Sequence, residues 1–403
     1  MSNLRKITLN ALVKVEDGGF STIVLDNALN NSDLSDNDKA LAANIFYGVC
    51  ERKLTLEHYV NKYLKKPVNT LPDYVRFALL MATYQIIYLE KIPAFAAVNE
   101  SVNLVSKSKF SGFKGLTNAV LRNIIRNGVD KIDDSNLSLK YSVDKTIVKA
   151  LINDYSFETA DSILKSTLMQ PDIYVRKNIL KQGEIEAEKT DLENCYIIKG
   201  AVEKTKGYKQ GLFYVQDKSS QMCCAFLNAN KDDMVLDVCA APGGKSFTTA
   251  QKAKGVVSCD IHPHRVELIK KGADRLGLKN VNAIINDATQ YNEKLGVFDK
   301  VLCDVPCSGI GVMRRKPDIK YKKLDDLDSL CKIQYDILQT SVKYLKSGGE
   351  IVYSTCTLLK RENEQIVNKF LEQNKDFELV DMKTLLPCEN ITDGFFMAKM
   401  IRR

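Results

Sequence analysis

The sequence predicts a multidomain protein with an all-α region, a small α+β region and a C-terminal α/β region. The chain has 403 residues, which is more than one ordinary hydrophobic core organises. Apolar residues recur at spacings of three and four throughout residues 1–128. From Asp232 onward, short apolar runs alternate with helical segments. We therefore expect domains over residues 1–130, 131–225 and 226–403.

The first region is expected to be helical throughout. The runs with helical spacing are LRKITLNALVKV, DKALAANIFYGVCERKLTLEHYVNKYL and DYVRFALLMATYQIIYLE. Asp36 or Asn37 is placed to cap the second run, and Pro72 lies near the start of the third. The polar stretch at 130–145 interrupts the pattern, so the first domain boundary is expected there.

The rest of the chain contains two different patterns. Residues 146–225 mix helical segments with strand-like runs such as DIYVRKN and GLFYV, which fits a small linker domain. Beyond them, MVLDVC, GVVSCD, VNAIIN, DKVLCD and GGEIVYS are short apolar runs bounded by turn residues. This alternation predicts a doubly wound, mostly parallel sheet, whose ligands bind beyond the carboxyl ends of the strands.

Composition excludes several classes of protein. No apolar run approaches the length of a membrane span, and the N-terminal stretch is interrupted by Asn, Lys and Glu, unlike a signal peptide. Eleven cysteines without a secretion signal indicate a reducing, cytoplasmic compartment. There is no C-x-x-C, and His262-Pro263-His264 has no companion ligands, so no metal is expected.

Positive charge is concentrated in two clusters. Residues 91–126 carry six basic side chains against Glu100, and residues 314–323 carry six against Asp318, within a net charge of +8. Such clusters are typical of proteins that bind a polyanion. For either cluster alone, a solvated charged face remains an open alternative. The candidate nucleic-acid contacts are Lys107, Lys109, Lys114, Arg122, Arg314, Arg315, Lys316 and Lys320.

The loop after the first C-terminal strand, DVCAAPGGKSFTTAQ at 237–251, indicates a nucleotide-like cofactor. Gly243 and Gly244 allow close approach of the backbone to a ligand. A phosphate-binding P-loop fails because Cys239 occupies the leading glycine position, and the dinucleotide fingerprint G-x-G-x-x-G is absent.

The remaining interpretation is that this loop binds S-adenosylmethionine. Asp237 precedes the glycine turn, and Asp260 ends the second strand, where a carboxylate suits the two hydroxyls of a ribose. Asp287, after the third strand, is placed to accept a hydrogen bond from an exocyclic amine such as that of adenine. A cationic sulfonium also lies more favourably beside carboxylates than a pyrophosphate does.

Two cysteines follow neighbouring strands of the predicted sheet. Cys307 lies in the turn after Asp304, and Cys356 lies in YSTCTLLKRENEQIV before an expected helix from Leu358 to Asn368. A thiolate that adds to carbon 6 of a pyrimidine activates carbon 5, and a helix N-terminus favours such a thiolate. Cys303 and the other cysteines are expected to be packing residues.

Taken together, DVCAAPGGK, CDVPCSGIGVMRRKPDIKY and YSTCT resemble the signature of the RNA 5-methylcytosine methyltransferases. The resemblance spans roughly residues 215–403, with QDKSSQ as an entry segment and TDGFFMAKMIRR as a closing hairpin strand. The helical region is similar to the RNA-binding NusB fold. In the branch with that domain, the resemblance implies an enzyme that methylates cytosine 967 of 16S ribosomal RNA of the small subunit. We expect the protein to be a monomer.

The resemblance also implies residue roles. Cys356 matches the nucleophile, Cys307 the cysteine that assists product release, and Asp304 a contact to the cytosine ring. The residues implied to hold S-adenosylmethionine are Cys239, Ala240, Ala241, Pro242, Gly243, Gly244, Lys245, Asp260, Asp287 and Asp304. Two positions depart from the family pattern, Thr357 in place of serine and Val305 in place of alanine. Neither removes a reactive group.

Three alternatives remain. In the first two, the protein is an enzyme with a different substrate, either another cytosine of ribosomal or transfer RNA or a cytosine of DNA. DNA enzymes use the Pro-Cys cysteine as nucleophile and need no Thr-Cys motif, which disfavours them. The third alternative is a non-catalytic RNA-binding factor for ribosome assembly, which has no use for Cys307, Cys356 or the APGGK loop.

Overall fold

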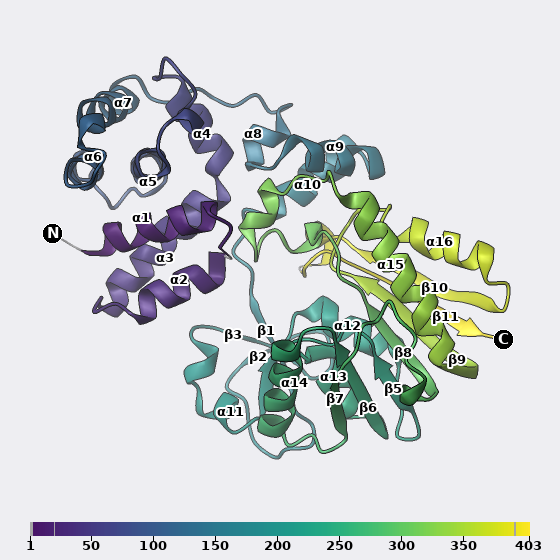
Figure 1. Cartoon of the computed structure of the whole chain (residues 1–403). Coiled ribbons are helices and arrows are strands. Elements are labelled where there is room, and N and C mark those ends of the chain that lie inside the picture. The colour runs from purple at the N-terminus through teal and green to yellow at the C-terminus, as the bar shows by residue number, and fades with distance from the viewer. Residues whose placement is uncertain (1–2, 20, 391) are drawn as a thin grey trace. The chain divides into compact units, whose positions relative to one another are not determined.

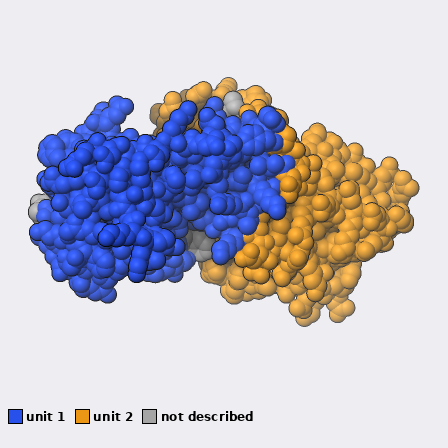
Figure 2. Space-filling view, turned by 90° about the horizontal axis from the view of Figure 1, so that it is seen from above, with its two compact units in different colours: residues 1–152, 157–168, 315–323 blue, residues 153–156, 169–314, 324–403 orange. Residues whose placement is uncertain are grey.

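The computed structural model describes residues 3–19, 21–390 and 392–403, and the chain forms two compact units (Figures 1 and 2). The helical unit contains residues 1–152, 157–168 and 315–323, blue in Figure 2. The sheet unit contains residues 153–156, 169–314 and 324–403, orange in Figure 2. None of the described helices combines the length and apolar character that crossing a membrane requires.

The helical unit is built around α5. Its helices are α1 (Asn3–Glu16), α2 (Ser21–Asn30), α3 (Asp36–Glu51), α4 (Lys53–Asn61), α5 (Asp73–Tyr88), α6 (Ala94–Ser106), α7 (Lys114–Asn127), α8 (Leu137–Tyr141), α9 (Lys145–Asp154) and α10 (Phe157–Ser166). Every α5 residue from Val75 to Gln85 is buried, and α5 packs against α1, α3, α4, α6 and α7. The N-cap of α3 is Ser35, whose hydroxyl accepts from the Asp38 N–H, so neither Asp36 nor Asn37 is the cap.

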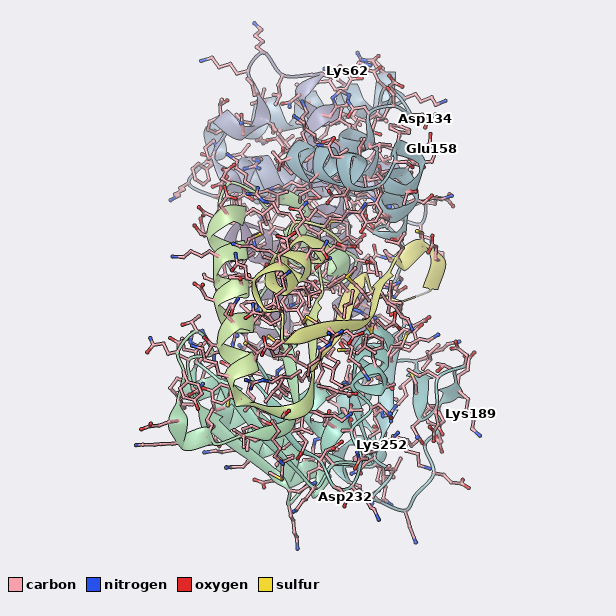
Figure 3. The ribbon with its side chains drawn as sticks, turned by 90° about the vertical axis from the view of Figure 1, so that its right-hand side faces the viewer. Lys62, Asp134, Glu158, Lys189, Asp232 and Lys252 are labelled. Atoms are coloured by element: carbon pink, nitrogen blue, oxygen red, sulfur yellow. The ribbon has the colours of Figure 1, made fainter. Side chains whose placement is uncertain are left out.

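A small antiparallel sheet follows the helices. Its strands are β1 (Ile173–Lys177), β2 (Glu188–Lys189), β3 (Cys195–Ile198) and β4 (Phe213–Val215), in the order β2-β3-β1-β4. The edge strand β2 is exposed at both residues, and Figure 3 shows Lys189 extending outward from it. The core under this sheet is a small cluster of apolar side chains around Val175 and Phe213.

The main sheet has seven strands in the order β10-β11-β9-β8-β5-β6-β7. Five are parallel: β5 (Met234–Asp237), β6 (Gly255–Asp260), β7 (Val281–Ile285), β8 (Phe298–Asp304) and β9 (Leu345–Thr355). The antiparallel pair β10 (Phe377–Leu385) and β11 (Phe395–Arg402) completes the sheet beside β9. The helices of this region are α12 (Lys218–Leu227), α13 (Gly244–Ala250), α14 (Pro263–Leu276), α15 (Leu327–Ser341) and α16 (Glu364–Gln373), with short helices α11 (Lys206–Lys209) and α17 (Pro387–Asn390).

This topology confirms the predicted parallel sheet and creates one switch point. After β5 the chain adds β6 and β7 on one side, then crosses to add β8 and β9 on the other. The loops that follow β5 and β8 therefore diverge at the carboxyl edge, which is where open α/β sheets bind ligands.

The expected linker domain over residues 131–225 does not form a separate unit. Helices α8 to α10 belong largely to the helical unit, while β1 to β4 belong to the sheet unit. Hydrogen bonds explain the second assignment. The Tyr214 and Thr248 hydroxyls are 2.7 Å apart, and Thr248 also donates to Gln216 at 2.7 Å, so β4 and the residue after it are fixed to α13.

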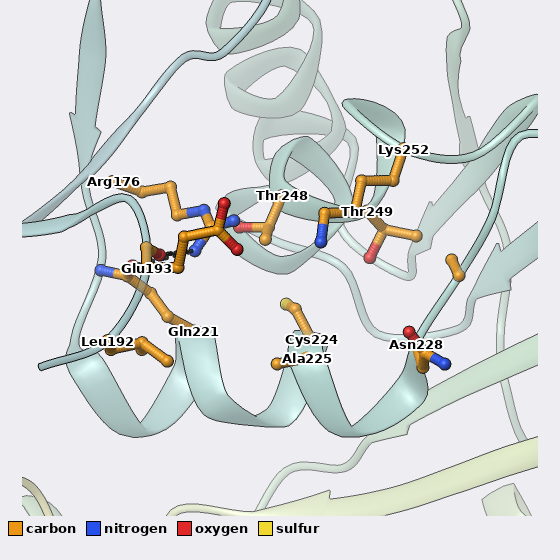
Figure 4. A pocket seen from close by; sticks show the side chains of 11 residues that line it. Arg176, Leu192, Glu193, Gln221, Cys224, Ala225, Asn228, Thr248, Thr249 and Lys252 are labelled. Carbon is orange, nitrogen blue, oxygen red and sulfur yellow. Dashed lines mark hydrogen bonds between the residues drawn. The ribbon is translucent and has the colours of Figure 1, made fainter.

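A further link lies beside a cavity of about 140 Å³ between α12, α13 and the small sheet (Figure 4). Arg176 of β1 reaches across it, donating to the Glu193 carbonyl at 2.9 Å and to the Gln221 side chain at 3.5 Å. These hydrogen bonds join residues far apart in the sequence, so composition and local pattern could not predict them. The small sheet is thus a part of the sheet unit.

Candidate active site

The loop between β5 and α13 needs its last residue, Gly243, to be glycine. Gly243 has φ +109°, in the left-handed region, and a Cβ there would lie 2.4 Å from the Phe247 ring. The loop is also fixed to the neighbouring strand, because the Ala240 N–H donates to the Cys259 carbonyl at 2.7 Å. The segment from Cys239 to Lys245 therefore lies at the carboxyl edge of β5 and β6, as the sequence predicts.

Asp237, the last residue of β5, is a buried carboxyl group with one satisfied oxygen. Its Oδ2 accepts from Ser246 Oγ at 2.6 Å, while Oδ1 has no hydrogen-bond partner among the described residues. Burial raises the pKa of Asp237 to about 7, against the lowering effect of the Ser246 hydroxyl and the Lys245 charge.

Asp304, at the end of β8, forms an ion pair with Lys245. Lys245 Nζ lies 2.7 Å from Asp304 Oδ2, and Ser354 Oγ donates to Asp304 Oδ1 at 2.8 Å. Burial lowers the pKa of Lys245, but the Asp304 charge and hydrogen bond outweigh it, so the pKa lies above its usual value. Lys245 is therefore ionised at neutral pH, and its ammonium group and the Ser354 hydroxyl hold the Asp304 carboxylate in one orientation.

Asp260 and Asp287 follow β6 and β7 at the same edge. Asp260 is buried, and its Oδ1 accepts from the His262 N–H at 2.9 Å. Asp287 Oδ1 accepts from the N–H and hydroxyl of Thr289, and its Oδ2 accepts from Gln290 at 3.3 Å. Asp287 is thus bonded within its own turn, and its contact to adenine remains a prediction.

The two predicted cysteines meet. Cys307 Sγ and Cys356 Sγ are 3.2 Å apart, because Cys307 follows β8, Cys356 follows β9, and these strands are parallel neighbours. The hydrogen bond to Cys356, followed by burial, raises the pKa of the Cys307 thiol well above its usual value. Cys303 is fully buried in the core, as expected.

The predicted setting of Cys356 at a helix N-terminus is wrong. The expected helix from Leu358 to Asn368 begins only at Glu364, eight residues after Cys356, and residues 356–363 form an irregular loop. A helix dipole acts within about its first turn, so α16 does not activate this thiol. The helical spacing of the apolar residues Ile366, Val367 and Phe370 belongs to α16 itself.

Several residues of the site carry no sequence signal. Glu362, Asn363 and Gln334 are fully buried polar residues next to the cysteine loops. Glu362 and Asn363 lie in the charged run KRENEQ, which resembles an exposed helix start. A glutamate in that position is usually solvated, so composition predicts the opposite of what is observed.

Two of the six basic residues in the second cluster, Arg314 and Lys320, make buried internal contacts. Arg314 Nε donates to Asp393 Oδ1 at 2.7 Å, in a pair that is almost fully buried. Within the helical unit, Lys320 is fully buried, and its Nζ donates to the carbonyls of Glu51 and Tyr141, each at 3.1 Å. The expectation that Arg314 and Lys320 contact RNA does not fit this burial. Lys316 is exposed and Arg315 half-buried.

The first basic cluster lies on the surface of the helical unit, where α6 ends and α7 begins. Its candidates Lys107, Lys109, Lys114 and Arg122 are all exposed. Lys109, Lys114 and Arg122 make no ion pair with any residue that the structure describes; Arg122 Nε donates to the Asn118 amide oxygen at 2.9 Å. Among the described residues, no group of three or more His, Cys, Asp or Glu side chains is arranged to hold a metal ion.

Comparisons with known proteins agree with this architecture. Residues 224–401 match the family model "16S rRNA methyltransferase RsmB/F", and residues 2–126 match the NusB family. The chain is 36% identical over its full length to "Probable ribosomal RNA small subunit methyltransferase B" of Bacillus subtilis (strain 168), covering 99% of that protein. It is 31% identical, with the same coverage, to "Ribosomal RNA small subunit methyltransferase B" of Yersinia enterocolitica.

Solved structures support the fold. The structure titled "Crystal Structure of PH0851" matches 97% of this chain and 97% of its own, with a TM-score of 0.84 at 21% identity. A structure of NSun6 from Pyrococcus horikoshii with SFG matches 64% of this chain and 98% of its own, with a TM-score of 0.60 at 20% identity.

Proposed function

The chain belongs to the ribosomal RNA small subunit methyltransferase B family, and from this premise we propose that it methylates carbon 5 of a cytosine in 16S ribosomal RNA. Family resemblance assigns cytosine 967. The enzyme is a methyltransferase, and S-adenosylmethionine supplies the methyl group.

The observation that carries the proposal is the pair of thiols 3.2 Å apart at the carboxyl ends of β8 and β9. Carbon 5 of cytosine is a poor nucleophile until a thiolate adds to carbon 6. Cys356 forms that carbon–sulfur bond, and carbon 5 then takes the methyl group. Loss of the carbon 5 proton to a base expels Cys356 and restores the aromatic ring. A second thiol beside the first is placed to assist this release.

The environment of Cys307 supports this division of roles. Its pKa is raised by the hydrogen bond to Cys356 and by burial, so Cys307 remains a protonated donor at neutral pH. A protonated Cys307 that donates to the Cys356 sulfur stabilises the thiolate on Cys356. Cys356 is proposed as the nucleophile because it matches the cysteine of the family's Thr-Cys motif.

Asp304 is the proposed contact to the cytosine ring edge. The Lys245 ammonium at 2.7 Å and the Ser354 hydroxyl at 2.8 Å fix its carboxylate in place. Protonation of the ring nitrogen next to carbon 4 stabilises the adduct. The resulting N–H donates a hydrogen bond, and a fixed carboxylate beside that edge accepts it.

The residues around the glycine loop fit the cofactor. Asp237 offers a buried carboxylate oxygen without a partner among the described residues, and the cofactor carries an ammonium group and a sulfonium. The loop from Cys239 to Lys245, with Asp260, Asp287 and Asp304, is proposed to hold it. Gly243 has no room for a side chain, because a Cβ there would lie 2.4 Å from the Phe247 ring, so the loop keeps its shape only with glycine at this position.

RNA is proposed to bind through phosphates at the exposed basic residues of the helical unit, Lys107, Lys109, Lys114 and Arg122, together with Lys316. Lysine and arginine contacts of this kind supply most of the affinity and little of the sequence specificity. The target base must leave its stack to reach the thiols.

Two other functions are less well supported. A DNA-type enzyme uses the Pro-Cys cysteine as nucleophile and needs no Thr-Cys motif, whereas this chain carries Cys356 in that motif, 3.2 Å from Cys307. A non-catalytic assembly factor has no need for an ion pair, a glycine loop and two adjacent thiols at one sheet edge.

The test uses labelled S-adenosylmethionine and unmodified small-subunit ribosomal RNA on a denaturing gel. Cys307→Ala is expected to accumulate a covalent protein–RNA species, and Cys356→Ala to transfer no methyl and form no such species. Cys388→Ala, at an exposed cysteine, is the matched control and should behave as the parent.

Each other outcome has a defined meaning. Trapping by Cys356→Ala instead of Cys307→Ala reverses the two roles. A parent protein that transfers no methyl to this RNA contradicts the substrate assignment.

A further inference from the structure

Each of the two segments that carry a thiol is held by one of two adjacent buried residues. Cys307 lies in the segment 305–309, which follows β8, and Cys356 begins the loop 356–363, which follows β9. Glu362 and Asn363, at the end of the second loop, are both fully buried. Their side chains contact the residues next to each cysteine.

Glu362 binds the Cys307 segment. Its Oε1 accepts from the Ser308 N–H at 2.8 Å, and its Oε2 accepts from Ser308 Oγ at 2.5 Å. Gln334 adds a second link, because its Nε2 donates both to Glu362 Oε1 at 2.9 Å and to the Pro306 carbonyl at 3.0 Å. The residues before and after Cys307 are therefore both fixed to one carboxylate.

Asn363 binds the Cys356 loop in the same way. Its Oδ1 accepts from Thr355 Oγ1 at 2.6 Å, and its Nδ2 donates to the Thr357 carbonyl at 3.1 Å. The two loops are also joined directly, since the Ser308 and Thr357 hydroxyls are 2.7 Å apart. The residues before and after Cys356 are thus fixed as well.

Burying a carboxylate in this way requires that its hydrogen bonds be satisfied, and both oxygens of Glu362 are. A leucine or methionine would fill the same volume without that requirement. An aliphatic side chain, however, offers no acceptor for the Ser308 N–H, and so leaves the Cys307 segment free to move.

We propose that Glu362 is a positioning residue that sets the place of Cys307 against Cys356. This inference rests on the proposed function for its catalytic meaning, but the position of the thiols is testable without RNA. Glu362 acts on the Cys307 segment through Ser308 and, by way of Gln334, through the Pro306 carbonyl. Its loss therefore impairs the step that needs Cys307, the release of the product, more than the attack by Cys356.

The first measurement is the rate at which the two thiols form a disulfide. Diamide takes up two electrons and two protons as the sulfur–sulfur bond forms, and peptide mass mapping identifies the Cys307–Cys356 bond among eleven cysteines. The parent should react readily, because thiols 3.2 Å apart need little movement. Glu362→Ala should react at least ~10-fold more slowly, the factor that corresponds to about 1.4 kcal/mol of lost positioning.

Conservative rescue separates positioning from general loss of structure. Glu362→Gln keeps an acceptor for Ser308 N–H and Gln334, and its amide donates to Ser308 Oγ, so it should react within about threefold of the parent. Ser308→Ala removes the hydroxyl contacts alone and reports on the same link if Glu362→Ala does not fold. Glu364→Ala is the matched control, because Glu364 is bonded to Thr384 and to neither cysteine segment.

The second measurement is the covalent protein–RNA species on the denaturing gel. Glu362→Ala should accumulate it as Cys307→Ala does, while Glu362→Gln should not. Parent-like disulfide rates in both Glu362→Ala and Ser308→Ala would overturn the proposal. A slow disulfide together with a parent that forms no adduct and transfers no methyl contradicts the proposed function and leaves the positioning role standing.

Discussion

At the scale of single residues, burial decides what each ionisable group does. Asp237 and Glu362 are both buried carboxyl groups at the same edge of the sheet. All three hydrogen bonds to Glu362 come from the protein itself, so Glu362 is structural in its contacts. Asp237 keeps one oxygen without a partner among the described residues, which is why we propose it as a cofactor-binding group.

Cofactor binding should depend on pH through Asp237. Its pKa is raised from 3.8 to about 7 by burial, and pairing with the cofactor's ammonium requires the ionised form. Between pH 6 and pH 7.5, the dissociation constant for S-adenosylmethionine in isothermal titration calorimetry should fall by about eightfold. Asp237→Asn should bind more weakly and show no such dependence, and a parent with a flat profile would contradict the assignment.

The same shift has the opposite effect on the protein without cofactor. The unfolded chain ionises Asp237 near pH 3.8, whereas the folded protein retains the proton until about pH 7. This group's stabilising contribution is therefore complete below pH 3.8 and is lost as the pH rises to about 7. Bound cofactor should reverse that trend.

At the scale of elements, the segment 315–323 shows how strongly context overrides composition. Its residues 317–321 form a short 3₁₀ helix within the helical unit, where Tyr321 Oη donates to the Cys50 carbonyl and accepts from the Lys53 N–H at 3.0 Å. Lys320 lies beside it with its ammonium group buried. A run of basic residues thus contains one anchor that points inward and neighbours that point to solvent.

The same substitution should change RNA affinity at Lys316 but not at Lys320. Lys316→Met should weaken RNA binding, since Lys316 is exposed, whereas Lys320→Met should leave RNA affinity within about twofold of the parent. Filter-binding measurements on the two variants test this directly. A loss of affinity in Lys320→Met with unchanged cofactor binding would restore Lys320 to the RNA surface.

Lys320 also predicts a pH effect on stability. Burial lowers its pKa to about 7, opposed by the charge of Glu51, from an unfolded value of 10.5. Its stabilising contribution is present above pH 10.5 and is lost as the pH falls toward 7. The difference in free energy of unfolding between parent and Lys320→Met should therefore grow in the parent's favour from pH 7 to pH 9 in urea titrations. An unchanged difference would contradict this account.

At the scale of the whole molecule, the basic residues proposed to bind RNA and the residues of the candidate active site lie on different parts of the chain. The exposed candidate lysines and arginine belong to the helical unit, while the thiols, the ion pair and the glycine loop belong to the sheet unit. Acidic side chains such as Asp134 and Glu158 are exposed on the helical unit too (Figure 3), so its basic residues form a local patch.

Charge reversal of this patch should separate RNA binding from cofactor binding. Lys109→Glu, Lys114→Glu and Arg122→Glu together should lower RNA affinity by at least ~10-fold and reduce the slope of log affinity against log salt by about two. The dissociation constant for S-adenosylmethionine should not change. A matched triple reversal at the exposed Lys189, Lys199 and Lys231 of the sheet unit should have a much smaller effect. Equal losses in both triples would indicate a non-specific effect of net charge.

The sequence by itself determined the features that depend on contiguous residues. The strand–loop–helix rhythm, the glycine loop and the positions of Asp304, Cys307 and Cys356 after their strands are all local patterns, and parallel strands bring such ends to one edge. The helix expected directly after Cys356 was wrong, and the chain forms two compact units where three domains were expected. Both features depend on contacts with distant segments.

Only the tertiary structure decided which charged residues are buried and how the two thiols are held. Lys316 and Lys320 are four positions apart in one basic run, yet Lys316 is exposed and Lys320 is buried. The difference comes from residues far along the chain, because the carbonyls of Glu51 and Tyr141 accept hydrogen bonds from Lys320. Glu362 is part of a charged run, but Ser308 and Gln334 satisfy its carboxylate from other elements. Burial of a polar group depends on partners that local sequence does not contain.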